Sequence, residues 1–268
     1  MTLFNLVILA IVQGITEFLP ISSSAHLVLL HEIGGPSEEA LALDVAVHLG
    51  SILAGVLYFR HDVGRALVGL GQVLRGSLSS SEAKLAAGLV VATIPAVIVG
   101  VVLLQTGWIH LLRNATVIGW MMILFGLMLY AAHRLAPEGR RAEEWTLRDA
   151  LVMGLWQSVA LIPGVSRSGI TLTSARMLGF DRFSAARVAM MMSIPITLVT
   201  GAVLAREVMQ SPVGPDLIRD AGIAAVLAFI AAYIALATMM KLLRYVSFTP
   251  YVIYRVILGA VLLTLAYS

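Results

Sequence analysis

Six apolar stretches, each long enough to cross a lipid bilayer as a single helix, run through this chain. A spanning helix needs about 20 consecutive apolar residues. Only 12% of the 268 residues are Asp, Glu, Lys or Arg, whereas a soluble domain carries about 25%. This composition excludes a soluble fold, and the high apolar content excludes a disordered chain. We therefore predict an all-α integral membrane protein with transmembrane helices at residues 40–59, 84–104, 115–134, 187–205, 221–240 and 250–267.

Two further apolar stretches, at residues 3–30 and 151–178, are each interrupted by a polar loop. The first loop reads PISSS from Pro20, and the second reads PGVSRSG from Pro163. Proline ends or kinks a helix, and irregular backbone at membrane depth is stable only where protein or a water-filled cavity surrounds it. We therefore predict two re-entrant helix–loop–helix hairpins, with two ordinary kinked spans as the alternative.

The two halves of the chain resemble each other. Gly14 and Glu17, followed by Pro and Ser-x-Ser, recur as Gly154 and Gln157, again followed by Pro and Ser-x-Ser; Glu17 and Gln157 lie 140 positions apart. We expect one membrane domain made of two repeats, 1–135 and 136–268, each a hairpin plus three spans. Three crossings are an odd number, so the repeats have opposite orientation. This inverted-topology plan is typical of transporters, which place their site at the midplane.

The basic residues test this topology. With the hairpins returning to their side of entry, thirteen of the 18 Lys and Arg residues fall on one side and three on the other, while Arg167 and Arg255 stay in the apolar region. Cytoplasmic loops carry the excess of positive charge. We therefore expect both termini and the opening of the site to face away from the cytoplasm. If the hairpins crossed fully, this bias would largely vanish.

The first loop and its flanks combine an acid, hydroxyls and a histidine. Glu17 lies in an apolar helix, where an isolated carboxylate needs a partner, and Gln13 lies four residues earlier on the same face. Ser22 and Ser23 follow Pro20, and His26 comes next. Capping of the second half-helix is the structural alternative for the serines, but it does not explain Glu17 and His26.

The second loop has the composition of an anion site. It contains Ser166, Arg167, Ser168 and Gly169, with Thr171 in the helix that follows. Free N–H groups at a helix N-terminus favour phosphate, and the Arg167 guanidinium matches phosphate oxygens. The alternative is that Arg167 pairs with Glu17 to neutralise two buried charges. The two interpretations overlap, because a resting pair can open around a ligand.

Together the two loops could perform phosphoryl transfer. A hydroxyl could attack, His26 could act as a base, Arg167 could stabilise phosphoryl charge, and Glu17 could hold a divalent cation. The chain has no Cys, which excludes thiol catalysis. These residues alone do not separate a hydrolase from a transporter. Outside the loops, we expect Arg255 to pair with a carboxylate or to extend toward the membrane surface, and His48 to line the core or a cavity rather than act as a ligand.

The strings QGITEFLPISSSAH and PGVSRSGIT resemble the two motifs of the undecaprenyl-diphosphatase family of the bacitracin-resistance type. The resemblance implies a bacterial plasma-membrane enzyme that hydrolyses undecaprenyl diphosphate to undecaprenyl phosphate and phosphate. This reaction recycles the lipid carrier of peptidoglycan and cell-wall synthesis. The resemblance also implies a divalent cation, Mg²⁺ or Ca²⁺. Gln13 occupies the family's Glu/Gln position, and as an amide it is a weaker metal ligand than a carboxylate.

The resemblance and the residues together assign roles at the site. We expect Ser23 as the nucleophile, activated by Glu17 or His26, although water or His26 itself are alternatives. We expect the catalytic residues to be Glu17, Ser23, His26 and Arg167, with Glu17 at the metal and substrate bound by Gln13, Ser22, Ser166, Ser168, Gly169 and Thr171. The expected partners are a polyprenyl diphosphate lipid and the bilayer, without nucleic acid. The sequence does not fix the oligomeric state, and a homodimer is one alternative. The alternative function is a transporter or flippase of a lipid phosphate or another anion.

Overall fold

The computed structural model describes residues 2–34, 40–209 and 214–267, and within these ranges the protein consists of helices. Six helices are long and apolar enough to cross a membrane, which confirms the predicted spans. Their bounds are α3 (Ala40–Tyr58), α5 (Ser81–Thr106), α7 (Ala115–Leu135), α10 (Arg182–Met209), α11 (Pro215–Leu242) and α12 (Thr249–Tyr267).

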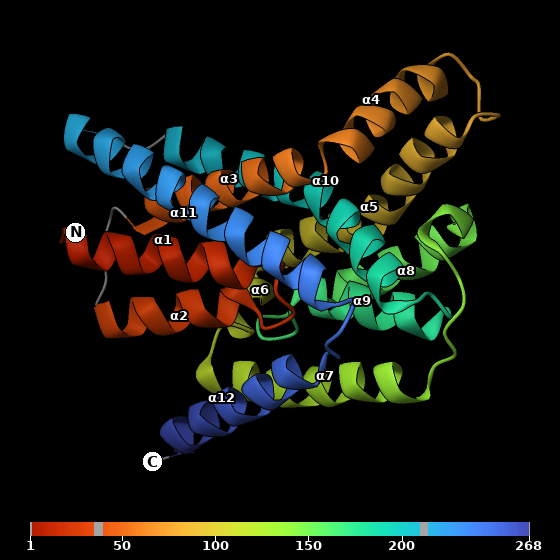
Figure 1. Ribbon diagram of the computed structural model, residues 1–268. Helices are drawn as coiled ribbons and strands as arrows, with labels where there is room; N and C mark the ends of the chain where they lie inside the picture. Colours follow the sequence, from red (N-terminus) through yellow and green to blue (C-terminus); the bar gives the residue numbers. More distant parts are fainter. Residues whose placement is uncertain (1, 35–39, 210–213, 268) are drawn as a thin grey trace.

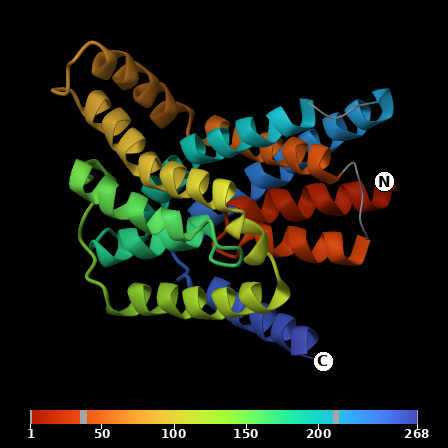
Figure 2. The same cartoon turned by 180° about the vertical axis from the view of Figure 1, so that it is seen from behind.

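The two interrupted stretches each form two helices. The first helix pair is α1 (Leu3–Phe18) with α2 (Ser23–Gly34), and the second is α8 (Leu147–Val159) with α9 (Arg167–Met177). The members of each pair pack against each other, so the chain turns back at both loops. The two pairs approach from opposite ends of the molecule, their loops meet near the middle, and both termini lie at the same end (Figures 1 and 2).

Each helix pair packs mainly on the half of the chain to which it does not belong. The first pair lies on α11 through α1, and the second lies on α5 through α8. The contact between α3 and α11 is matched by the contact between α10 and α5, and α7 packs along α12. This exchange of partners brings the loop of one half against the loop of the other.

Three elements were not expected from the sequence. Helix α4 (Arg60–Leu74) packs on α5, and the two project together from the bundle (Figure 1). The short helix α6 (Trp108–Leu111) follows α5, and the 3₁₀ helix η1 (Ala142–Glu144) lies in the linker between the halves. In its first turn, α4 is tied to α10 by Asp62, whose carboxylate accepts from Arg187 Nη2 at 2.6 Å and Nε at 2.8 Å.

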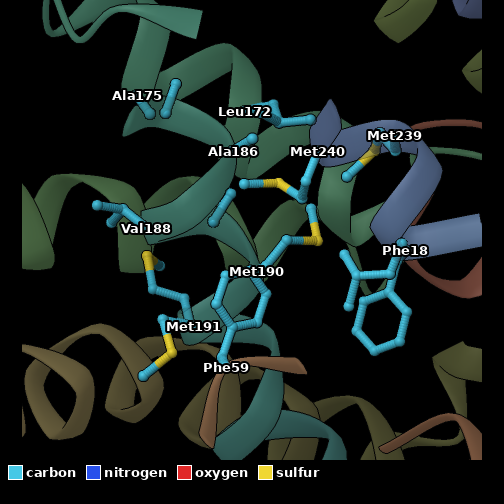
Figure 3. Packing of buried hydrophobic residues seen from close by; sticks show 14 of the residues in the cluster. Phe18, Phe59, Leu172, Ala175, Ala186, Val188, Met190, Met191, Met239 and Met240 are labelled. Atoms are coloured by element: carbon cyan, nitrogen blue, oxygen red, sulfur yellow. The ribbon is translucent and has the colours of Figure 1, made fainter. Parts of the chain in front are cut away.

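The main apolar core lies where α9, α10 and α11 meet. Met190, Met191, Met239 and Met240 pack there with Phe18 from the end of α1 (Figure 3). Methionine fills irregular spaces between helices, because its side chain is unbranched and flexible. The core therefore supports α1 immediately beside its last turn, which carries Glu17.

Candidate active site

An ion pair between the two helix pairs is at the centre of the site. Glu17, in the last turn of α1, accepts a hydrogen bond through Oε1 from Arg167 Nη2 at the start of α9. The Glu17 side chain is 2% exposed and that of Arg167 is 21% exposed. A buried carboxylate needs such a partner. The structure thus brings together the two charged residues of motifs 150 positions apart.

The second carboxylate oxygen of Glu17, Oε2, accepts hydrogen bonds from a hydroxyl and an amide. Ser23 Oγ donates to Oε2 at 2.8 Å, and Gln13 Nε2 donates to the same atom at 2.8 Å. A hydroxyl that donates to a carboxylate is placed to lose its proton to that carboxylate when it attacks an electrophile. Of the two activators expected for Ser23, Glu17 is therefore the one in contact with it.

His26 points to a different partner. Its Nδ1 lies 2.7 Å from Ser22 O, and its Nε2 lies 2.6 Å from the hydroxyl of Tyr254 on α12. A carbonyl only accepts, so Nδ1 donates, and in the neutral ring Nε2 accepts from Tyr254. The two rings also stack, with centroids 5.7 Å apart. Tyr254 was not expected at the site, because it occurs singly in an apolar span.

Two serines at the loop ends have the same unusual backbone. Ser22 has φ 72° and Ser166 has φ 69°, in the left-handed region that costs a non-glycine residue about 1 kcal/mol or more. Ser166 Oγ caps α9 by accepting from Gly169 N at 3.1 Å. Capping, which sequence analysis considered only for the serines of the first loop, therefore accounts for Ser166 of the second loop. Such strain persists only where the surroundings enforce it, and it concentrates at functional sites.

The other hydroxyls of the second loop bond to protein carbonyls. Ser168 Oγ donates to Leu19 O of the first loop at 2.9 Å, and Thr171 Oγ1 lies 2.8 Å from Arg167 O. Arg167 Nη1 donates to Thr197 Oγ1 on α10, another residue that sequence analysis missed. These bonds hold the second loop and orient Arg167 toward the first loop.

Arg255 joins the two loops from α12. It is completely buried, and its guanidinium donates to Pro20 O at 3.3 Å and to Gly164 O at 2.9 Å, one carbonyl from each loop. It also donates to Met122 O at 3.1 Å on α7. Both expectations for Arg255, a carboxylate partner or an extension to the membrane surface, are therefore wrong, because its hydrogen bonds go to backbone carbonyls inside the protein. Gly169 provides the room, since a methyl group built on it would lie 2.8 Å from Arg255 Nη1.

Two side chains at the site, Glu17 and Gln13, have oxygens of the kind that could hold a cation. Gln13 Oε1 is buried without a hydrogen-bond partner, and it shares an amide with the nitrogen bonded to Glu17. Among the described residues, no group of three or more His, Cys, Asp or Glu side chains gathers in a form that could hold a metal. A divalent ion here would therefore complete its coordination with water and substrate oxygens, as Mg²⁺ does in phosphoryl-transfer enzymes.

Known proteins resemble this chain over its full length. The family described as bacitracin resistance protein BacA matches residues 6–261. A protein of Dinoroseobacter shibae named undecaprenyl-diphosphatase is 53% identical over 268 residues, covering all of both chains. Proteins with the same name from a Ruegeria species and from Hahella chejuensis are 54% and 44% identical; each match covers this chain completely and at least 99% of the relative.

Proposed function

The chain belongs to the bacitracin resistance protein BacA family, and on this premise we propose how its site hydrolyses undecaprenyl diphosphate to undecaprenyl phosphate and inorganic phosphate. The protein is a membrane phosphatase that acts on a lipid diphosphate. The observation that carries the proposal is the shared carboxylate of Glu17, which orients the Ser23 hydroxyl on one oxygen and pairs with Arg167 on the other. The apolar surfaces of the helices serve the lipid tail, and the loops serve the diphosphate.

In the first step Ser23 Oγ attacks the terminal phosphorus and its proton passes to Glu17. The bond from that phosphorus to the bridging oxygen breaks, and undecaprenyl phosphate leaves. Protonation of Glu17 weakens its pairing with Arg167, so the guanidinium is released to the phosphoryl oxygens as their charge develops. The resting ion pair and the anion site are thus two states of the same residues.

In the second step the Tyr254 hydroxyl moves off His26 Nε2, water attacks the phosphoserine and gives a proton to this nitrogen, and the imidazolium then releases the proton to bulk water. The bond from phosphorus to Ser23 Oγ breaks, Glu17 returns its proton to the serine, and phosphate leaves. Direct attack by water, without a phosphoserine, is the alternative mechanism. The proposed substrate-binding residues around the diphosphate are Gln13, Ser22, Ser166, Ser168, Gly169 and Thr171.

A divalent cation, Mg²⁺ or Ca²⁺, belongs to this proposal. Glu17 would hold it, and the unpartnered Gln13 Oε1 is a further oxygen of the kind that hard cations bind. When bound, the ion neutralises charge on the diphosphate oxygens.

We also propose an inverted-topology repeat in which both helix pairs are re-entrant hairpins. The reciprocal packing of α1 on α11 and of α8 on α5, and the position of both termini at one end (Figure 1), support it. The excess of basic residues supports an extracytoplasmic location of both termini and an outward opening of the site. The repeats at 1–135 and 136–268 then form one domain of the bacterial plasma membrane.

Phosphate release from undecaprenyl diphosphate by purified protein in detergent tests the proposal. Glu17→Gln keeps the shape of the side chain but removes the base and the partner of Arg167, and we expect a loss of about 10³-fold or more. Gln157→Ala is the matched control at the corresponding position of the other helix pair and should stay within about threefold of wild type. Equal activity of wild type and Glu17→Gln would contradict the enzymatic role of this site and favour lipid transport.

A further inference from the structure

A second histidine faces Glu17 from α3. His48 Nε2 lies 4.0 Å from Glu17 Oε2, and the His48 side chain is 21% exposed. This oxygen is the one that does not bond to Arg167. His48 therefore approaches the carboxylate from the side opposite the guanidinium, at a distance too long for a direct hydrogen bond.

The other ring nitrogen determines the protonation of Nε2. His48 Nδ1 lies 2.7 Å from Asp44 O, one turn earlier in the same helix. A carbonyl only accepts, so Nδ1 carries the hydrogen, and Nε2 of the neutral ring presents a lone pair to the carboxylate. Histidines that bind metals commonly have this arrangement, with one nitrogen free and the other donating to a backbone carbonyl.

Gln13, whose amide also contacts this carboxylate oxygen, carries an acceptor without a partner. Gln13 Oε1 is buried and has no hydrogen-bond partner, while Nε2 of the same amide lies 2.8 Å from Glu17 Oε2. Buried acceptors without a partner are uncommon in folded proteins, and a bound cation is one of the groups that can satisfy such an oxygen. Gln13 and His48 come from different helices, α1 and α3, and both neighbour the carboxylate oxygen that also accepts from Ser23 Oγ at 2.8 Å.

We propose that His48 Nε2 is a ligand of the divalent cation, together with Glu17 Oε2, and that the Gln13 amide, which now points its nitrogen at Glu17, rotates on binding so that Oε1 is the third protein donor. This inference rests on the proposed function, which includes a divalent cation at Glu17. One carboxylate, one neutral imidazole and one amide leave a divalent ion with a net charge of +1. The ion then retains a strong attraction for the anionic diphosphate. Imidazole also shifts preference from Ca²⁺ and Mg²⁺ toward transition metals, so Mn²⁺ should bind more tightly than Mg²⁺.

Mn²⁺ is the probe for the test, because electron spin-echo modulation reports a directly bound ¹⁴N nucleus. The full-length protein in detergent should bind Mn²⁺ and show modulation from an imidazole nitrogen. His48→Gln should abolish this modulation and weaken Mn²⁺ binding by about tenfold or more, since loss of even an outer-shell partner costs about 10–100-fold. His61→Gln, on the exposed surface of α4, is the matched control and should keep both properties.

Gln13→Glu provides an independent test that adds charge rather than removing a ligand. It should tighten Mn²⁺ binding by about tenfold or more, because a carboxylate is a stronger ligand for this ion than an amide, and the nitrogen modulation should remain. Persistence of the modulation in His48→Gln, absence of Mn²⁺ binding by the wild type, or unchanged affinity in Gln13→Glu would each overturn the inference.

The same preparations keep this inference separate from the enzymatic role. If the wild type releases phosphate and Glu17→Gln does not, the proposed function stands whatever the Mn²⁺ spectra show. If Glu17→Gln and His48→Gln both release phosphate like the wild type while the nitrogen modulation depends on His48, the metal site stands without the proposed function.

Discussion

The two helix pairs use the same backbone for different chemistry. In each loop a serine with positive φ precedes the second helix, and its hydroxyl lies 3.2 Å from the hydroxyl two residues later: Ser22 and Ser24 in the first pair, Ser166 and Ser168 in the second. The residue between these serines is Ser23 in one loop and Arg167 in the other. One loop therefore presents the hydroxyl that we propose as the nucleophile, and the other presents the guanidinium that we propose binds the phosphoryl group.

The preceding helices differ in the same way. Glu17 lies at the end of α1 and pairs with Arg167, whereas the corresponding Gln157 of α8 is neutral and donates to Ala92 O of α5 at 3.2 Å. A second carboxylate at Gln157 would add a buried charge beside a backbone carbonyl, which is not a donor. The comparison shows that the two helix pairs share a backbone geometry at their loops but carry different side chains at the corresponding positions.

Among the variants that test this comparison of the two helix pairs, the largest effect is expected at Arg167. Arg167→Lys keeps one positive charge but cannot donate to Glu17 and Thr197 in the same planar arrangement. We expect the rate of phosphate release to fall by about 10²–10³-fold, which is the typical loss when a donor to developing charge is removed. Steady-state kinetics measure it. A variant with the wild-type rate would show that the second helix pair provides only a scaffold.

An intermediate effect is expected where each helix pair meets the opposite half. A methyl group built on Gly14 would lie 2.6 Å from Ala228 O, and one on Gly154 would lie 2.6 Å from Ala92 O. Gly14→Ala and Gly154→Ala should each destabilise the protein by about 1–3 kcal/mol through overpacking, measured by thermal unfolding in detergent. Gly71→Ala in α4, with no atom within 4 Å of the new methyl group, should be neutral or stabilising. Destabilisation by only one of the first two variants would break the structural equivalence of the pairs.

The smallest effect is expected at the open end of the second helix pair. Asp149, outside the six spanning helices, forms a capping box with Thr146, the N-cap of α8, and its carboxylate accepts from Arg140 Nη2 at 2.6 Å and Thr146 Oγ1 at 2.7 Å. Burial raises the pKa of Asp149, but these hydrogen bonds lower it by a larger amount. The pKa of Asp149 therefore lies below its usual value. The charged form therefore stabilises the fold above about pH 4, and this contribution disappears as the pH falls through the folded-state pKa.

Asp149→Asn should lower stability by about 1 kcal/mol at pH 7 and by progressively less as the pH falls from about 4, the usual pKa of Asp, toward the lower folded-state pKa, below which the wild-type side chain is neutral as well. The first helix pair provides the control, since its cap is the hydroxyl of Thr2, which accepts from Asn5 N at 3.3 Å. Thr2→Ala should therefore have an effect that does not depend on pH in this range. An equal loss for Asp149→Asn at neutral and acidic pH, by thermal unfolding, would contradict the assigned role.

The sequence predicted those residues of the candidate site that lie close together in one of the two motifs. Glu17 and Ser23 belong to one run and Arg167 to another, and the prediction that the two runs meet required only that both loops lie at the same depth. His48, Thr197, Tyr254 and the contacts of Arg255 depend on how the spans cross, and each occurs singly in an apolar helix. Sequence periodicity carries no information on which distant helix such a residue will face.

The helix boundaries likewise divide into those that the sequence predicted and those that depend on local capping or tertiary packing. Apolar length predicted the position of every span, but α5 begins at Ser81, three residues before the expected start, because Ser80 Oγ caps it by accepting from Ala83 N at 3.0 Å. Helix α4 was missed because its composition is polar, and its stability comes from packing on α5 and from the Asp62–Arg187 pair.

The bonds of Arg255 impose an order on biogenesis. A ribosome synthesises α12 last, and until that helix is inserted the Arg255 guanidinium cannot join the carbonyls of Pro20 and Gly164. A nascent chain ending before residue 249 already contains Glu17, Ser23, His26 and Arg167, but lacks the guanidinium that joins the two loops. We therefore expect that completion of the polypeptide is coupled to completion of the site, and that a chain ending before α12 is inactive in the membrane.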